Sequence, residues 1–358
     1  MKTRPIHAFA LMLTAALLAT ACGSSESTTE TSAKTSAAAN VTAPSNDTTA
    51  SVGAIGPIGV SIPLLTTDFW RVFNASTEAE IKARGIHALE IVNAGGNAAQ
   101  QLADIDALVS QGAKGIIVSP VDSGAITAKL KELASKGIKV VVVNDGVSAP
   151  VEIVVRANNL DYGILACDAM SKVITKGSII HIAGDPTNVA AQERAKGFDD
   201  CMKEKAPNVK MVRIDAAGWA ASEVANALPA LLDSTPDVVG VYMHAGGAFL
   251  EPTLVALKAK GKLKHAGDPG HIYIATIDGI QSEFKAIRDG NADFVIAQPV
   301  DLYGKYGVDY LAQVLSGTAL KEGATDHGTK IVRDSQGNLQ DALQPVLVSA
   351  DNVKDFLK

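Results

Sequence analysis

Residues 139–157 have the sequence KVVVVNDGVSAPVEIVVRA. Two apolar runs with the composition of strands, 140–143 and 151–157, follow one another here across a turn-forming Asn-Asp-Gly and a short loop. Elsewhere from Gly56 onward, most such runs are followed by an amphipathic stretch of helical period that ends at Gly or Lys-Gly. Because this stretch breaks a regular βα alternation, we expect the chain to pass here from one α/β lobe into a second.

The apolar runs on both sides of this break predict parallel sheets. Runs rich in Val and Ile that alternate with helices are typical of strands buried on both faces. We expect strands at 58–62, 88–92, 115–118, 140–143, 151–157, 178–182, 209–214, 238–243, 272–277 and 293–297. We expect helices at 69–84, 97–110, 123–135, 160–174, 189–205, 221–232, 249–260, 280–288 and 302–315. So many βα strands favour two doubly wound lobes over one open sheet.

The length and charge of the chain agree with a two-lobed protein that does not bind polyanions. The 358 residues suggest two domains as a prior. The formal net charge is −6, and removal of a leader that carries Lys2 and Arg4 but no acidic residue gives −6 − 2 = −8. An acidic chain without basic runs argues against nucleic acid and anionic membranes as partners.

The N-terminus has the pattern of an export signal. Lys2 and Arg4 precede an apolar run, 8–19, that is too short to span a bilayer. The following Ala19-Thr20-Ala21-Cys22 resembles a bacterial lipoprotein processing box. We therefore expect a signal peptide at 1–21, a lipid on Cys22 and a Ser/Thr/Ala-rich flexible tether over 22–55. The alternative is an ordinary signal peptide cleaved near Ala21, which would leave a protein without an anchor.

Two further cysteines, Cys167 and Cys201, lie in the helices expected on either side of one strand. An exported chain meets an oxidising compartment, in which an even pair of cysteines can form a disulfide. A disulfide and two buried thiols are both compatible with the sequence.

The unusual side chains of the chain gather after strands. In open parallel sheets, ligands bind beyond the carboxyl ends of the strands. The candidate binding residues at or near these positions are Thr67, Phe69, Trp70, Ser119, Asn144, Asp145, Arg194, Trp219, His244, Asp278 and Gln298. Aromatic faces can pack against the C–H face of a polyhydroxylated solute, while amides, carboxylates and a guanidinium bond its hydroxyl groups. The set therefore predicts a pocket for a sugar or a sugar alcohol.

Each of these residues also has an ordinary structural explanation. Phe69 and Trp70 could belong to the core of an amphipathic helix, and Trp219 could anchor a loop. Arg194 could be a solvated helix charge, and His244 a hydrogen-bonded core histidine. Asp278-Gly279 could form only a turn and a helix cap, and Gln298 could simply end a strand. The binding hypothesis depends on their joint placement at one edge of the two sheets.

An ordered set of short segments resembles a known family. The segments are Asp68-Phe69-Trp70, Ile117-Val118-Ser119-Pro120 with Asp122-Ser123, Ala190-Ala191-Gln192-Glu193-Arg194 before Gly197-Phe198, Ile277-Asp278-Gly279, and Ile296-Ala297-Gln298-Pro299. They resemble the type I periplasmic binding proteins for ribose, galactose, xylose and related pentoses or polyols, over essentially all of 56–358.

The resemblance implies a fold of two lobes joined by three crossings. The first lobe would hold 56–157 and about 299–335, and the second 158–298 and about 336–358, with a returning strand near 346–348. Phe69 and Trp70 would be the stacking aromatics of the first lobe. The contacts to hydroxyl groups from the second lobe and hinge would be Arg194, Trp219, Asp278 and Gln298. Family members often carry Asp-Arg in place of Asn144-Asp145 and Asn-Asp in place of His244-Ala245-Gly246, so the solute could also be an acyclic polyol.

The resemblance further implies an extracytoplasmic role without catalysis. The closed form would deliver its solute to a membrane permease that is driven by a cytoplasmic ATPase. We expect a monomer with no cofactor and no metal, in contact with the membrane only through its lipid. The chain contains no Gly-x-Ser-x-Gly, no His-Glu-x-x-His and no glycine-rich phosphate loop followed by Lys-Ser/Thr. A signal segment stands where a repressor would carry a DNA-reading helix-turn-helix. A lipid-anchored sensor that presents its closed form to a receptor kinase remains an alternative to transport.

Overall fold

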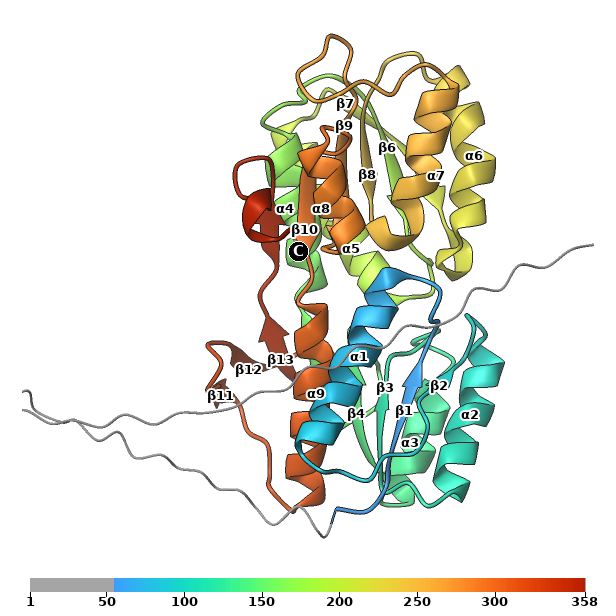
Figure 1. Cartoon of the computed structure of the whole chain (residues 1–358), viewed down its shortest axis with the longest axis vertical. Coiled ribbons are helices and arrows are strands. Elements are labelled where there is room, and N and C mark those ends of the chain that lie inside the picture. The colour runs from blue at the N-terminus through green and yellow to red at the C-terminus, as the bar shows by residue number, and fades with distance from the viewer. Residues whose placement is uncertain (1–54, 358) are drawn as a thin grey trace, which may run out of the picture. The chain divides into compact units, whose positions relative to one another are not determined.

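The computed structural model describes residues 55–357, so the expected signal peptide, Cys22 and nearly all of the tether lie outside the described residues. Two mostly parallel sheets with helices on both faces form two lobes (Figure 1), which confirms the expected fold class. The first sheet has eight strands in the order β11-β12-β13-β5-β4-β3-β1-β2. The second has six, in the order β14-β10-β9-β8-β6-β7.

The first lobe is built around four parallel strands with mostly apolar side chains. They are β1 (Ile58–Ile62), β3 (Gly115–Val118), β4 (Lys139–Val143) and β5 (Ile153–Ala157), with the short β2 (Val92–Asn93) at the edge. The helices α1 (Asp68–Ala83) and α9 (Val300–Leu315) share a core with one face of this sheet. The helices α2 (Ala98–Ser110) and α3 (Thr127–Ser135) share a core with the other face. All but one residue of these four strands are buried, which agrees with the near-continuous apolar runs in the sequence.

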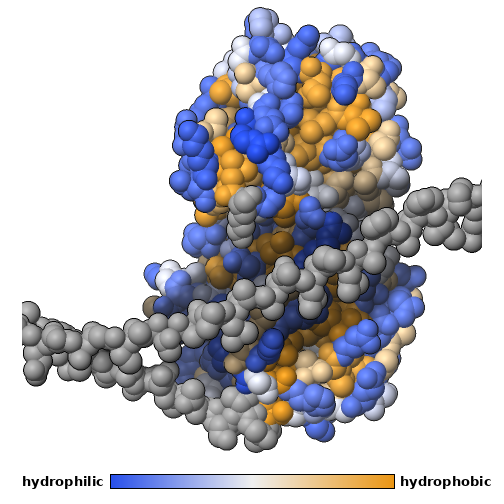
Figure 2. All heavy atoms as spheres, in the orientation of Figure 1, coloured by the Kyte–Doolittle hydropathy of each residue, from blue (hydrophilic) through white to orange (hydrophobic). Residues whose placement is uncertain are grey.

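The second lobe repeats this arrangement. Its parallel strands are β6 (Gly177–Ala183), β7 (Val209–Asp215), β8 (Val238–Met243), β9 (Tyr273–Asp278) and β10 (Phe294–Ala297). The helices α4 (Asn159–Met170) and α5 (Val189–Lys205) cover one face, and α6 (Ala221–Ser234), α7 (Gly246–Ala259) and α8 (Gln281–Arg288) cover the other. The short helices are η2 (Ala217–Trp219) and η3 (Val353–Asp355). On the face shown in Figure 2, hydrophilic and hydrophobic residues lie side by side on both lobes.

The chain passes between the two sheets three times, after β5, after β10 and after β13 (Leu339–Leu343). The last strand, β14 (Val346–Val348), pairs antiparallel with β10 as the returning strand of the second lobe. Among the described helices, none is both long enough and apolar enough to span a membrane.

The third crossing lies further along the chain than the sequence predicts. The sequence predicts it near residue 335, but β13 pairs in parallel with β5, so the chain leaves the first sheet only after Leu343. We also missed β11 (Gly323–Ala324) and β12 (Lys330–Arg333), which extend this sheet at its edge. Their sequences lack an apolar run. β13 has a buried charged residue in place of an apolar one: its Asp341 accepts hydrogen bonds from Tyr310 and Thr329.

Two glycines let α4 and α5 lie unusually close together. A Cβ atom on Gly163 would come within 2.2 Å of the Arg194 carbonyl oxygen, and one on Gly197 within 2.1 Å of a carbonyl oxygen of α4. The same two helices are joined by a disulfide between Cys167 and Cys201. The residues alone left the bonded and the free state open, and the structure has the bonded one.

Candidate functional site

A cavity of about 80 Å³, partly open to solvent, lies where the carboxyl ends of the two sheets face each other. The first lobe lines it with Pro63, Leu64, Thr67, Phe69, Trp70, Gly96, Ser119, Pro120, Val121 and Asn144. The second lobe and the crossing after β10 line it with Asn188, Ala190, Arg194, Gly218, Trp219, Ala245, Ala248, Asp278 and Gln298.

Aromatic side chains form part of the wall on both sides of the cavity. Phe69 and Trp70 begin α1, directly after the loop that follows β1, and their rings meet edge to face at 5.1 Å. Across the cavity, Trp219 stacks on Phe249 with ring centroids 6.2 Å apart. Trp219 also covers Gly184, where a Cβ atom would lie 2.2 Å from the indole ring. The ring can therefore occupy this position only because residue 184 is a glycine.

The guanidinium of Arg194 is held in place by three acceptors. Its Nε donates to Asn159 Oδ1 at 2.8 Å, Nη1 donates to the His244 carbonyl at 2.7 Å, and Nη2 donates to Gln298 Oε1 at 3.1 Å. The guanidinium also lies 5.3 Å from the centre of the Tyr162 ring. The side chain is 3% exposed. A charge bonded on three sides keeps a fixed direction toward the cavity.

Asp278 supplies a buried carboxylate at the end of β9. Its Oδ2 accepts from the Gly247 backbone N–H at 2.8 Å, and its Oδ1 accepts from Gln298 Nε2 at 3.0 Å. Gln298 is therefore oriented by Arg194 and Asp278 together. Burial raises the pKa of Asp278 from its ordinary value of 3.8 to about 6, although the nearby Arg194 charge lowers it. Asp278 is thus an anion near neutral pH in a site where ionisation is unfavourable.

The first lobe offers polar atoms that have no partner within the described part of the chain. Ser119 Oγ, after β3, and Asn144 Oδ1, after β4, are both buried and accept or donate no hydrogen bond there. Both residues line the cavity. A buried polar atom without a partner is costly in free energy, so such atoms commonly mark a position that a bound molecule or water satisfies. Asn144 also adopts φ +66°, a left-handed conformation that Asn tolerates better than most residues.

Comparison with known proteins places this geometry in a family. Residues 58–319 match the model of the periplasmic binding protein domain. The chain belongs to the periplasmic binding protein family.

Individual relatives of this binding protein agree with the match. The ribose import binding protein of Bacillus subtilis is 25% identical over 267 residues, which are 74% of this chain and 83% of that one. The xylitol-binding protein of Mycolicibacterium smegmatis is 29% identical over 210 residues, which are 57% of this chain and 56% of that one. A solved ABC transporter solute-binding protein from Mycobacterium smegmatis, with bound glycerol, superimposes with a TM-score of 0.73 at 23% identity, covering 85% of this chain and 97% of that chain. These matches confirm the resemblance seen in the sequence.

The structure brings nine of the eleven candidate residues of this binding protein to the cavity wall. They are Thr67, Phe69, Trp70, Ser119, Asn144, Arg194, Trp219, Asp278 and Gln298. The other two, Asp145 and His244, are fully buried and do not line the cavity.

Asp145 is turned away from the cavity although its neighbour Asn144 lines it. Its carboxylate accepts from Ser123 Oγ at 2.8 Å and from the backbone N–H groups of Gly146 at 2.7 Å and Ala190 at 3.0 Å. It also accepts from the side-chain amide of Asn188. Consecutive side chains at a strand end point in different directions, so two neighbours seldom face the same space.

His244 belongs to a buried chain of hydrogen bonds beneath the cavity. The Gly184 N–H donates to its Nδ1 at 3.1 Å, so the proton of this neutral ring is on Nε2. That Nε2 lies 2.8 Å from His181 Nε2, and His181 Nδ1 lies 3.0 Å from Asp199 Oδ1. Burial lowers the pKa of both histidines, which favours the neutral rings that this arrangement needs. The contribution of His244 to the cavity is its carbonyl, which accepts from Arg194.

Sequence reasoning missed Asn188 as a cavity residue. Asn188 is the N-cap of α5, and its Oδ1 accepts from the Ala191 N–H at 3.0 Å. An Asn before a helix predicts such a cap. That signal was available, but it does not indicate that the same residue also faces a cavity.

Proposed function

We propose that this binding protein captures a small, uncharged polar solute, a sugar or a sugar alcohol, between its lobes and delivers it to the permease of an ABC importer. The observation that carries the proposal is the cavity between the carboxyl ends of the two sheets, with aromatic faces and fixed hydrogen-bonding groups on opposite sides. Arg194 and Asp278 carry opposite charges within it, so a neutral solute suits the site better than an ion.

Each group of wall residues has a role in this proposal. Phe69, Trp70 and Trp219 pack against the C–H faces of the solute. Asp278 accepts hydrogen bonds from solute hydroxyl groups, and Arg194 donates to them. Every solute hydroxyl that leaves water needs such a partner, which the fixed geometry supplies without further ordering of side chains.

The relatives support the class of solute and the role in import. One matching protein is a ribose import binding protein and another binds xylitol, a sugar and a sugar alcohol. The family and these relatives consist of binding proteins, which supports solute capture without catalysis. The importer role also has support in the relatives' names, whereas the sensor alternative has none.

Solute binding is coupled to closure of the two lobes about their three crossings. Because the cavity has walls from both lobes, a solute contacts all of its partners only when the lobes are together. Binding then shifts the population toward the closed form, which the permease would recognise. To make the closed form dominant instead of rare, the solute must bind it more tightly than the open form by about 5.5 kcal/mol. Micromolar binding has a free energy of about 8 kcal/mol, which is enough.

We also propose that the protein works as a monomer outside the cytoplasm, attached through a lipid on Cys22. The support for the anchor is the Ala19-Thr20-Ala21-Cys22 sequence, followed by a Ser/Thr/Ala-rich stretch of the length needed for a tether. Labelling of cells with a fatty acid should mark the full-length chain and leave a Cys22→Ala variant unmarked. Equal labelling of both chains would contradict the anchor.

A thermal-shift screen of pentoses, hexoses and linear polyols tests the binding function. A solute that binds only the folded state raises stability by about 2.7 kcal/mol at a hundredfold excess over its dissociation constant. We expect Trp70→Ala and Asp278→Ala to abolish the response of the parent protein without unfolding it. The matched control is Val72→Ala, because Val72 is exposed on the same helix as Trp70. If both cavity variants respond like the parent, the proposed site is wrong.

A further inference from the structure

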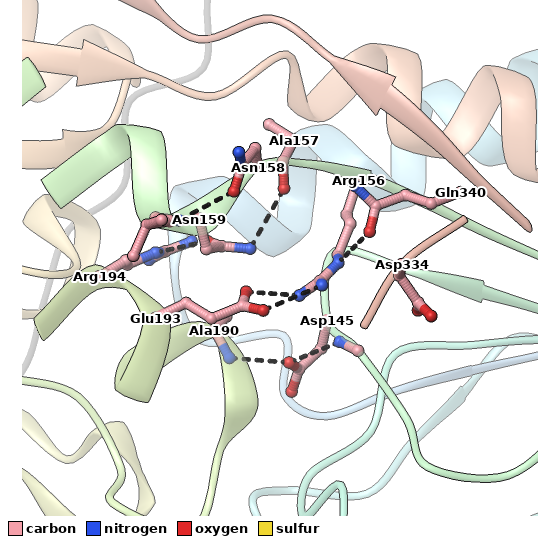
Figure 3. A network of polar contacts seen from close by, with 12 residues as sticks. Asp145, Arg156, Ala157, Asn158, Asn159, Ala190, Glu193, Arg194, Asp334 and Gln340 are labelled. Atoms are coloured by element: carbon pink, nitrogen blue, oxygen red, sulfur yellow. Dashed lines mark hydrogen bonds and ion pairs between the residues drawn. The ribbon is translucent and has the colours of Figure 1, made fainter. Parts of the chain in front are cut away.

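The start of α5, which belongs to the second lobe, is bonded directly to a carboxylate of the first lobe. Asp145 accepts two hydrogen bonds from its own lobe, from Ser123 Oγ and the Gly146 N–H. It accepts two more from the other lobe, from the Ala190 N–H at 3.0 Å and the Asn188 side chain. Figure 3 shows Asp145 facing Ala190 across this boundary. No atom of a solute is needed for these four bonds.

A second contact between the lobes lies beside it. Arg156, at the end of β5, donates from Nε to Gln340 Oε1 at 2.9 Å within the first lobe. Its Nη1 and Nη2 donate to the two carboxylate oxygens of Glu193 in α5 at 2.7 and 3.1 Å (Figure 3). The Arg156 side chain is 6% exposed and that of Glu193 is 25% exposed. We call Asp145, Arg156, Asn188, Ala190 and Glu193 the interlobe clamp.

Separation of the lobes would replace the interlobe bonds of the clamp by bonds to water. Asp145 would lose two of its four protein donors, and the Ala190 N–H would lose its protein acceptor, because N–H groups in the first turn of a helix have no intrahelical partner. Asp145 also places a negative charge at the positive end of the helix dipole of α5. Hydrogen bonds to charged groups are stronger than those between neutral groups, so the clamp favours the arrangement in which the lobes are together.

The clamp is continuous with the solute site. Asn188 lines the cavity, donates to Asp145 and caps α5 through its Oδ1. Ala190, whose N–H is bound to Asp145, also lines the cavity, and Arg194 lies on the same helix one turn later. Asp145 therefore places the end of α5 from which three cavity residues project, without touching the cavity itself.

We propose that Asp145 is a positioning residue that sets solute affinity by holding α5 of the second lobe against the first. This inference rests on the proposed function, because it concerns affinity for the captured solute. When the competent form is only partly populated, the apparent dissociation constant equals the intrinsic one divided by the fraction of that form. Any loss of clamp energy then appears as weaker binding, even though no solute contact has changed.

The test uses Asp145→Asn, which keeps the shape of the side chain but turns one acceptor into a donor that faces other donors. The matched control is Asp122→Asn. Asp122 belongs to the same lobe and accepts from the Gly124 and Ala125 N–H groups, within its own turn only. A second clamp variant, Glu193→Ala, removes the partner of Arg156 and leaves Asp145 unchanged. All variants are made in the full chain, and folding is checked by circular dichroism.

Two measurements separate a positioning role from a general structural one. The first is affinity and dissociation rate for the solute identified in the thermal-shift screen. We expect at least tenfold weaker binding for Asp145→Asn, mostly through faster dissociation, a smaller loss for Glu193→Ala and none for Asp122→Asn. The second is hydrogen exchange of the Ala190 amide, which owes its protection to Asp145. We expect faster exchange in Asp145→Asn than in the parent, with exchange in Asp122→Asn unchanged.

The outcomes for the clamp and for the proposed function are distinct. Affinity of Asp145→Asn within twofold of the parent, or equal exchange of the Ala190 amide in Asp145→Asn and in the parent, overturns the clamp. If no sugar or polyol binds the parent, the proposed function fails, and exchange without solute still decides whether Asp145 holds α5. If Asp145→Asn does not fold, the affinity of Glu193→Ala decides, and an unchanged value overturns the clamp.

Discussion

Replacement of Asp278 by Asn should raise stability at neutral pH and abolish solute binding at the same time. Burial raises the pKa of Asp278 from 3.8 to about 6, so its ionised form is disfavoured in the folded protein. The folded state then binds more protons than the unfolded state between these two values, and stability falls as the pH rises from about 4 to about 6. The folded-state and unfolded-state pKa values differ by about two, which corresponds to a loss of about 3 kcal/mol of stability at pH 7 and above.

The hydrogen bonds of Asp278 determine how much stability the substitution loses. An Asn can still accept from the Gly247 N–H, but its amide group would then face Gln298 Nε2, which is also a donor. The Gln298 side chain cannot turn around freely, because its Oε1 accepts from Arg194 and from Tyr303. Loss of one such bond costs about 1 to 2 kcal/mol, so we expect Asp278→Asn to be more stable than the parent by about 1 to 2 kcal/mol at pH 7.5.

Urea unfolding followed by circular dichroism between pH 4 and 8 measures this effect. The stability difference between Asp278→Asn and the parent should change by about 3 kcal/mol across that range, with the variant gaining as the pH rises. Asp351→Asn, at an exposed position in the turn after β14, should keep a constant difference. Parallel curves for Asp278→Asn and the parent from pH 4 to 8 would refute the argument that burial disfavours the ionised carboxylate.

Three further changes test other parts of the site and of the second lobe. Gly184→Ala should weaken solute binding about tenfold in a titration, equivalent to about 1.4 kcal/mol, because its Cβ would occupy the position of the Trp219 ring; unchanged affinity would mean that this ring is not a solute contact. Ser119→Ala should weaken solute binding without lowering the unfolding free energy, because the Ser119 hydroxyl has no partner in the described protein; equal losses of both would contradict this. Replacement of both Cys167 and Cys201 by Ser should lower the unfolding free energy by about 4 kcal/mol, since the bond joins positions with a sequence separation of 34; a urea midpoint insensitive to reducing agent would contradict it.

The central strands were predictable because they are buried on both faces. The strands at 58–62 and 115–118 have the bounds expected from the sequence, because short continuous apolar runs are typical of strands buried on both faces. The strand expected at 88–92 shrinks to Val92–Asn93 with an isolated bridge at Ala88, because it lies at the sheet edge. β13 escaped prediction because its buried Gln340 and Asp341 are satisfied by partners distant in sequence, which no local pattern reveals.

The candidate site was predictable to the level of strand ends but not of side-chain direction. The rule that ligands bind beyond the carboxyl ends of parallel strands brought Trp70, Arg194 and Asp278 together from positions far apart in the chain. The same rule cannot distinguish Asn144 from Asp145, because both follow one strand and their directions depend on the local backbone. His244 was misassigned for a related reason, since its partner His181 comes from the neighbouring strand.

The pair Asn144-Asp145 also limits which solutes suit the cavity. At the end of β4, the charged Asp145 accepts hydrogen bonds from four protein donors, whereas the neutral Asn144 lines the cavity. Among the described first-lobe residues that line the cavity, Ser119 and Asn144 carry buried oxygens without a hydrogen-bond partner. The charges of the cavity wall thus come from the second lobe, through Arg194 and Asp278. A solute whose hydroxyl groups cluster toward one side, with its C–H face toward the first-lobe aromatics, matches this uneven distribution better than one that needs charged partners on both sides.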